Sequence, residues 1–254
     1  MSQLAVKGKA PMTGYDRNDK FGNGWKDPDG NKCDARQDIL TRDMTNVVYK
    51  DSLQCTVASG TLNDLYTGKS INWKVKAGSV DIDHAVALGN VWISGGQQLS
   101  QDQRVAVAND PLNLIASDAS ANRAKGDENA AEWLPPNKAF RCQYVATQIS
   151  VKHKYALSVT APEKAAMAKV LDTCPAQLAA EVTPIKPAGQ SKAKTEAPAE
   201  EKKVDTAAKE PAATQLVHPG AFCSDAGATG TGKKNGKPYT CKASDTEDRL
   251  RWRA

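Results

Sequence analysis

Residues 80–88 read VDIDHAVAL, and residues 109–127 read NDPLNLIASDASANRAKGD. The first stretch begins with the alternation of a short strand and continues with a helical pattern, so that His84 lies at the junction of the two. The second is dense in Asn, Asp, Lys and Gly, a composition suited to oxygen donors on a short strand, a turn and a helix. Together they predict a small site of strands and helix centred on His84.

His84 is a candidate general base, because an imidazole titrates near neutrality and can take a proton from water at physiological pH. Asp83 precedes it and supplies a hard oxygen ligand for a divalent cation. Asp81 shares a strand face with Asp83, and both an orienting role and a purely structural role stay open for it. An Asp-His pair by itself is more often a helix start or a surface hydrogen bond than a catalytic centre.

The segments around this centre predict an α+β fold with a small sheet. A turn-rich polar segment at 27–31 leads into a helix at 37–43. Short strands separated by Gly and Asn/Asp turns are expected at 56–61, 70–75 and 80–83, and they suit antiparallel pairing. Further helices are expected at 85–92, 101–108, 125–133, 144–154 and 162–171.

The composition changes after residue 178. Residues 179–217 hold ten Ala, four Pro and twelve balanced charges without an aromatic residue, which predicts a flexible, Pro-stiffened linker between a domain at 1–178 and a module at 218–254. A module of so few residues rarely folds without a covalent cross-link, and we therefore expect a disulfide in it. Its positive charge suggests an anionic partner such as cell-wall polymer or nucleic acid, and a merely solvated surface explains that charge equally well.

The six cysteines form no C-x-x-C pair, which disfavours zinc ribbons and thioredoxin-like sites and favours disulfides. Pairing of neighbours along the chain predicts the bridges Cys33–Cys55, Cys142–Cys174 and Cys223–Cys241, and persistent disulfides imply an oxidising compartment. No stretch approaches the ~18 apolar residues of a membrane span. We therefore expect a secreted or cell-surface protein whose signal peptide has been removed.

A formal net charge of +5 is compatible with a polyanionic substrate but does not demonstrate one. Arg17, Arg36, Arg42 and Arg104 either line a nucleic-acid groove or pair with neighbouring aspartates, and the sequence leaves this open. Trp25 is interpreted as a core or interface aromatic, with base stacking as the minority alternative.

The spacing of Asp83-His84, Asn113, Asn122 and the ending Lys125-Gly126 resembles the HNH signature of the ββα-metal nucleases, including the HNH domains of CRISPR effector nucleases. The resemblance implies that His84 is the base, that Asp83 and Asn122 hold one metal ion, and that Asn113 braces the loop. Lys125 is then a candidate phosphate contact or supporting residue, or else a solvated charge on a helix. Because no thiol pairs flank the motif, the chain departs from the zinc-containing branch of the family.

The resemblance extends over about residues 5–178 to the secreted HNH-family proteins of actinobacteria, which are related to the nuclease part of GmrSD-type restriction enzymes. It rests on the segments GYDR, NKCDARQDILTRDM, SGTLNDLYTGKSI, VDIDHAVALGNVW, NDPLNLIASDASANRAKGD, AAEWLPPNKAFRCQYVATQ and VKHKY. It implies a ββα-metal core and an endonuclease that hydrolyses nucleic acid, with DNA favoured over RNA. An all-oxygen site favours Mg²⁺ or Mn²⁺ as the cofactor.

Two alternatives accompany this hypothesis. The first is a catalytically silent cell-surface binding protein on a nuclease scaffold, and the presence of Asp83, His84 and Asn122 argues against it. The second is a nuclease toxin effector, which shares the chemistry but not the purpose. The sequence leaves strand preference, sequence specificity and oligomeric state open.

Overall fold

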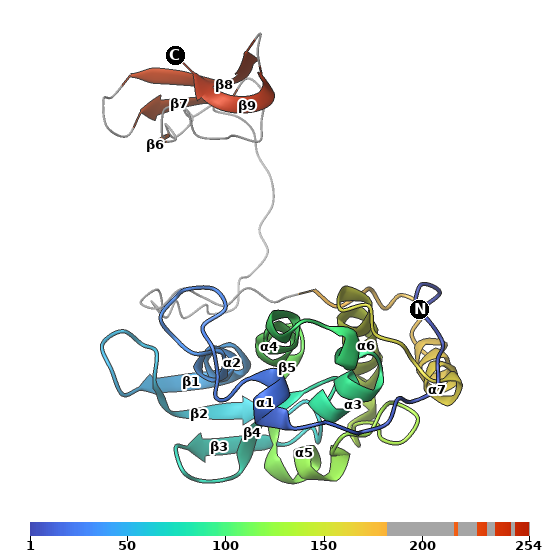
Figure 1. The fold of residues 1–254 in the computed structure, drawn as a ribbon. Helices are drawn as coiled ribbons and strands as arrows, with labels where there is room; N and C mark the ends of the chain where they lie inside the picture. Colours follow the sequence, from blue (N-terminus) through green and yellow to red (C-terminus); the bar gives the residue numbers. More distant parts are fainter. Residues whose placement is uncertain (182–215, 218–227, 233–236, 245–246, 254) are drawn as a thin grey trace, which may run out of the picture. The chain divides into compact units, whose positions relative to one another are not determined.

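The computed structural model describes residues 1–181, 216–217, 228–232, 237–244 and 247–253, and the chain divides into two compact units, Met1–Ala193 and Lys194–Ala254 (Figure 1). The division falls inside the predicted linker at 179–217, most of which lies outside the described residues. The disulfides Cys33–Cys55 and Cys142–Cys174 are both present in the first unit. In the part of the chain that is described, no helix is long and apolar enough to cross a membrane.

The first sheet is an antiparallel meander in the order β1-β2-β3, and it packs against helix α2 (Ala35–Asp43). Ile39 and Leu40 of the helix are fully buried in a cluster with Leu62 and Trp73 of the sheet. The sequence predicted β2 and β3 but not β1, which follows α2 directly with no Gly or Pro turn between them. The strands are β1 (Met44–Tyr49), β2 (Val57–Asn63) and β3 (Ser70–Lys74).

The second sheet consists of β4 (Val80–His84) and β5 (Leu114–Asp118), which pair antiparallel with His84 opposite Leu114. Thus the predicted strand at 80–83 pairs with a partner downstream rather than with β3. Helix α5 (Ala119–Lys125) follows β5 at once, capped by the Asp118 side chain. Figure 1 shows α5 beside β4, and the strand, strand and helix together position the site.

Of the remaining helices, those at 101–109, 141–154 and 161–171 follow the sequence predictions to within a few residues, whereas the helix at 17–21 was not predicted. Tyr66, Tyr144 and Phe140 pack edge-to-face or tilted within a second core cluster. A buried Lys152–Glu163 ion pair joins the last two helices of this unit. The helices are α1 (Arg17–Phe21), α3 (Leu88–Ile93), α4 (Gln101–Asn109), α6 (Arg141–Lys154) and α7 (Ala161–Leu171), with 3₁₀ turns at Gly96–Gln98 and Lys138–Phe140.

Two helix predictions are wrong, one in the existence of the helix and one in where it begins. The helix expected at 125–133 does not form, because Gly126 takes a left-handed φ of 52° that ends α5, and Asn129 then caps a turn by accepting a hydrogen bond from the Ala131 amide. Likewise, the helix expected from residue 85 begins only at Leu88. Ala85 and Val86 instead donate their backbone amides to the carbonyl oxygen and the Oδ1 of Asn113.

The second unit contains a four-stranded sheet in the order β6-β7-β8-β9. Cys241 and Trp252 are buried together on paired positions of β8 and β9. The predicted bridge Cys223–Cys241 involves Cys223, which lies outside the described residues. The strands are β6 (Leu216–Val217), β7 (Thr229–Gly232), β8 (Pro238–Ser244) and β9 (Glu247–Arg253).

Candidate active site around His84

His84 is the last residue of β4 and is only 5% exposed. Its Nε2 lies 2.9 Å from the carbonyl oxygen of Ala108, and its ring stacks on Trp25 with centroids 5.9 Å apart and planes 13° apart. Burial lowers the pKa of His84 to about 3, so the ring is neutral. Since a neutral ring must donate from Nε2 to bond the Ala108 carbonyl, the lone pair is on Nδ1.

A cavity of about 300 Å³ opens beside His84. That volume is at the lower end of the range for small-ligand sites. Its walls come from α1, from the loop that carries Trp25, and from the end of α4, so segments distant in sequence meet at the imidazole. Arg17, Trp25 and Asn109 line it together with His84.

The structure distinguishes the roles of the four arginines that the sequence left undecided. Arg42 pairs with Asp43 and donates to two backbone carbonyls, and Arg104 is bonded to carbonyls around α4. Arg36 lies over the ring of Trp73. Arg17 is exposed at the His84 cavity and makes no ion pair within the described residues.

The Asp83 side chain contacts a different set of groups from the His84 ring. Its Oδ2 accepts a 2.6 Å hydrogen bond from the Tyr66 hydroxyl, and the ammonium of Lys125 lies 3.0 Å from Oδ2 and 3.1 Å from Oδ1. Lys125 also donates to the His84 carbonyl at 2.9 Å. Burial raises the pKa of Asp83, while the charge of Lys125 and the Tyr66 hydrogen bond oppose that rise.

Neither of the two surface roles considered for Lys125, a phosphate contact or a solvated helix charge, fits its position. Its side chain is 0% exposed, so it is neither a solvated helix charge nor open to a phosphate in this arrangement. It acts instead as a supporting residue that ties α5 to the end of β4 through Asp83 and His84.

Asn113 is fully buried at the start of the segment that leads into β5. Its Oδ1 accepts from the Val86 amide at 2.8 Å, and its Nδ2 donates to the carbonyls of Val86 and Val107 at 3.2 and 3.3 Å. These bonds connect the loop after His84 with α4. Such contacts are those expected of a residue that braces the loop.

Asn122, on α5, contacts Asp81 rather than Asp83. Its Nδ2 donates to Oδ2 of Asp81 at 3.1 Å. The Asp81 side chain is 40% exposed, and Arg123 lies 4.0 Å from the same oxygen. Thus the structure brings Asn122 and Asp81 together at the surface and places Asp83 in a buried ion pair.

The donors fit a hard divalent cation by chemical type, since Asp81, Asp83 and Asn122 all offer oxygen. Their arrangement fits less well at Asp83, where a cation would have to displace the Lys125 ammonium. Across the described ranges, no three His, Cys, Asp or Glu side chains are gathered as a metal site.

Sequence reasoning missed three contributors to this site. Tyr66 gave no signal, because nothing in a tyrosine's local sequence shows a hydrogen bond to a carboxylate 17 residues away. The carbonyl of Ala108 belongs to the backbone and leaves no mark in the sequence. Trp25 was interpreted as a core or interface aromatic, and its stacking on His84 is a tertiary contact.

Comparison with known proteins identifies a family and a relative of this chain. The family described as GmrSD restriction endonucleases, C-terminal domain, matches residues 34–170, a range that includes Asp83, His84, Asn113 and Asn122. A protein of Arthroderma benhamiae described as an uncharacterized secreted protein is 41% identical over 176 residues, which cover 68% of this chain and 82% of that relative. No solved structure matches.

The buried ion pair predicts a large stability effect at Lys125. Lys125→Met leaves the Asp83 carboxylate buried without its cation, so we expect the free energy of unfolding to fall by about 3–5 kcal/mol. Adding Asp83→Asn removes the orphaned charge and should restore part of that loss. The measurement is urea unfolding of the single and double variants, with the exposed Arg123→Met as the control, for which a change within about 0.5 kcal/mol is expected. Equal stability of Lys125→Met and wild type would show that the pair is not the anchor of α5.

Proposed function

The chain belongs to the family of the C-terminal domain of GmrSD restriction endonucleases, and from this we propose that it is an HNH-type endonuclease that hydrolyses phosphodiester bonds of nucleic acid. The observation that carries the proposal is the state of His84: a neutral imidazole, fixed by a carbonyl and by Trp25, beside a cavity lined by Arg17, which has no ion pair among the described residues. The order of strand, strand and helix, with His84 ending β4 and Asn122 on α5, supports a ββα arrangement.

Cleavage of a phosphodiester needs an activated water, because the anionic phosphate repels nucleophiles. In the proposed mechanism Nδ1 of His84 takes the proton of the attacking water. A pKa of about 3 makes the ring a weak base in the free protein. A phosphate anion beside it favours the protonated form, which raises the pKa toward the range in which base catalysis is effective.

Arg17 supplies the positive charge on the cavity side of the site. Its guanidinium presents donors that match phosphoryl oxygens, and within the described residues no carboxylate competes for it in an ion pair. We assign it to binding and orienting the phosphate next to His84. Asn113 holds the loop after His84 so that the imidazole keeps its position.

A divalent cation, Mg²⁺ or Mn²⁺ by the all-oxygen donor set, supplies positive charge against the charge that develops on the phosphoryl and leaving oxygens. The resemblance assigns Asp83 and Asn122 as its ligands, which requires Lys125 to leave Asp83. The observed contact of Asn122 with Asp81 makes Asp81 the carboxylate available to a cation without that displacement.

A second candidate function is the catalytically silent scaffold. It is favoured by one observation, that the Asp83 carboxylate is already neutralised by a buried ammonium. We rank it below the nuclease because His84 lines a cavity and its Nδ1 has no hydrogen-bond partner among the described residues, neither of which a purely structural histidine needs.

We also propose that the protein acts outside the cell, on DNA in preference to RNA. The relative's description as a secreted protein and the two disulfides of the first unit support the extracellular site of action. The preference for DNA rests on the resemblance to HNH endonucleases.

The first functional prediction is that His84→Ala abolishes cleavage of plasmid DNA in the presence of Mg²⁺ or Mn²⁺. Loss of the general base should lower the rate by ~10²–10⁴-fold. The measurement is plasmid nicking by wild type and variant. Circular dichroism establishes that the variant is folded. Wild-type nicking by a folded His84→Ala protein would remove His84 from the mechanism, and a wild type that nicks nothing would favour the silent scaffold.

The second functional prediction concerns Arg17. Because a hydrogen bond to a charged group contributes about 1.5–3 kcal/mol, Arg17→Ala should lower kcat/KM on DNA by roughly 10- to 100-fold, with Arg17→Lys intermediate. Lys169→Ala removes an equal charge from an exposed position on α7 and serves as the matched control. Equal losses in the Arg17 and Lys169 variants would mean that only overall charge matters.

A further inference from the structure

We propose that the segment from Asp27 to Asp38, which comprises a loop and the first turn of α2, binds a calcium ion at a site separate from His84. The segment joins three aspartates and an asparagine at the spacing of a calcium-binding loop, and one of its carboxylate oxygens is buried without a hydrogen-bond partner among the described residues. Nothing in the proposed nuclease chemistry uses these residues, so the inference stands independently of that function.

Asp38 provides the first evidence for a missing ligand. It is only 3% exposed, and its Oδ1 accepts a 3.0 Å hydrogen bond from Nδ2 of Asn31. Its Oδ2 is buried and has no hydrogen-bond partner among the described residues. A buried carboxylate oxygen without a donor is costly, and a bound cation removes that cost.

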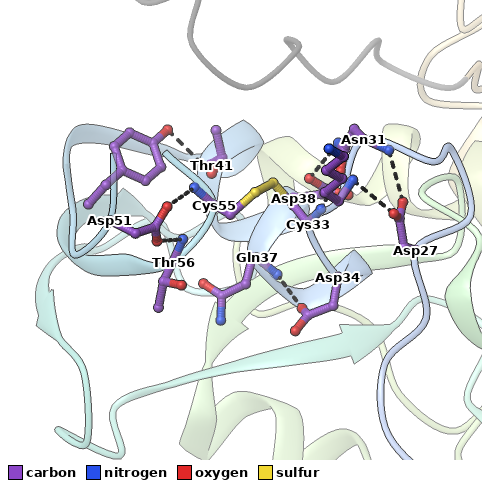
Figure 2. Close-up of a disulfide and its surroundings, with 12 residues drawn as sticks. Asp27, Asn31, Cys33, Asp34, Gln37, Asp38, Thr41, Asp51, Cys55 and Thr56 are labelled. Atoms are coloured by element: carbon purple, nitrogen blue, oxygen red, sulfur yellow. Dashed lines mark hydrogen bonds between the residues drawn. A yellow bond between two sulfur atoms is a disulfide. The ribbon is translucent and has the colours of Figure 1, made fainter. Parts of the chain in front are cut away.

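Asn31 hydrogen-bonds to three aspartates of the loop, and Figure 2 shows it beside Asp27 and Asp38. Nδ2 of Asn31 lies 3.2 Å from Oδ2 of Asp29, and the two Asp27 oxygens accept from the amides of residues 30–32. Asn31 therefore lies between Asp29 and Asp38 and next to Asp27.

No cation of the described chain neutralises this cluster. The ion pairs of the described residues include none to Asp27, Asp29, Asp34 or Asp38. Of the other buried acids, Asp83, Asp110 and Glu163 each pair with a lysine, and Asp64 accepts hydrogen bonds at both of its oxygens. Asp38 has neither a cation nor a donor at its Oδ2 among the described residues.

The spacing of the oxygen donors matches a known way of holding calcium. With Asp27 as position one, Asp29, Asn31 and Asp38 fall at positions three, five and twelve, which carry side-chain ligands in the twelve-residue loop of EF-hands. Position six, where that loop needs a residue of positive φ, is Lys32 with φ 75°. Position seven, which supplies a backbone carbonyl, is Cys33, held in place by its disulfide to Cys55 (Figure 2).

The loop as described is not closed around a cation. The amide nitrogen of Asn31 bridges Asp29 and Asp38, and the three carboxylates are not gathered as a metal site among the described residues. Binding therefore requires Asn31 to rotate and offer its oxygen in place of its nitrogen. Calcium suits such a loop because it accepts six to eight oxygens in irregular geometry, whereas Mg²⁺ requires a near-ideal octahedron.

The departures from the usual loop set the expected affinity. Position twelve is Asp38 instead of a longer glutamate, and position six is lysine instead of glycine. Both weaken binding, so we expect a dissociation constant of about 10⁻⁵–10⁻³ M, toward the range of extracellular calcium modules.

The test is calcium titration of the full chain after treatment with EDTA, followed by calorimetry and thermal unfolding. We expect one Ca²⁺ to bind per chain, at the segment from Asp27 to Asp38. At a Ca²⁺ concentration a hundredfold above Kd, the Tm should rise by roughly 5–10 °C. Mg²⁺ at the same concentration should have a much smaller effect. Absence of binding heat together with an unchanged Tm overturns the proposal, and equal effects of Mg²⁺ and Ca²⁺ overturn the assignment to calcium.

Variants locate the site. Asp29→Asn changes an exposed side chain and Asp38→Asn removes a buried charge, so the folding of the protein without calcium should survive both changes. Each should weaken Ca²⁺ binding at least tenfold, whereas Asp102→Asn, on an exposed position of α4, should leave it unchanged. Wild-type affinity in both Asp29→Asn and Asp38→Asn would place any bound calcium elsewhere and contradict the inference.

Discussion

The ammonium of Lys125, buried between the Asp83 carboxylate and the His84 carbonyl, holds the helix of the site against its first strand. A charge pair removed from water is stabilising only when hydrogen bonds satisfy both members, and here Tyr66 completes the set. Because the pair involves the last two residues of β4, it fixes the point at which the chain turns away from the sheet. The position of the imidazole depends on that point.

Alternation along β4 separates the chemical groups of the site. His84 contacts Trp25, Ala108 and the cavity, while Asp81 and Asp83, which share the opposite strand face, contact α5 and Tyr66. Because the backbone of β4 lies between the two faces, a phosphate can contact groups of both only where the strand ends, at His84.

Local signals in the sequence predicted much of this arrangement. Alternation and helical periodicity located β4, α4, α6 and α7 to within a few residues, since those segments carry clear patterns and clear stop signals. Contacts between distant segments could not be predicted. Lys125 looks like any surface lysine until Asp83, 42 residues earlier, is placed beside it. Arg17 and Arg42 are likewise similar in sequence, and only tertiary packing makes one structural and leaves the other at the cavity.

The most direct test of the account is end-group analysis after digestion of single- and double-stranded DNA and RNA by the full chain, with Mg²⁺, Mn²⁺ or EDTA. The account predicts metal-dependent cleavage, strongest on DNA, that leaves 5′-phosphate and 3′-hydroxyl ends, because the activated water attacks phosphorus and the 3′ oxygen leaves. Absence of cleavage on all four substrates, or products with 3′-phosphate ends, would contradict it.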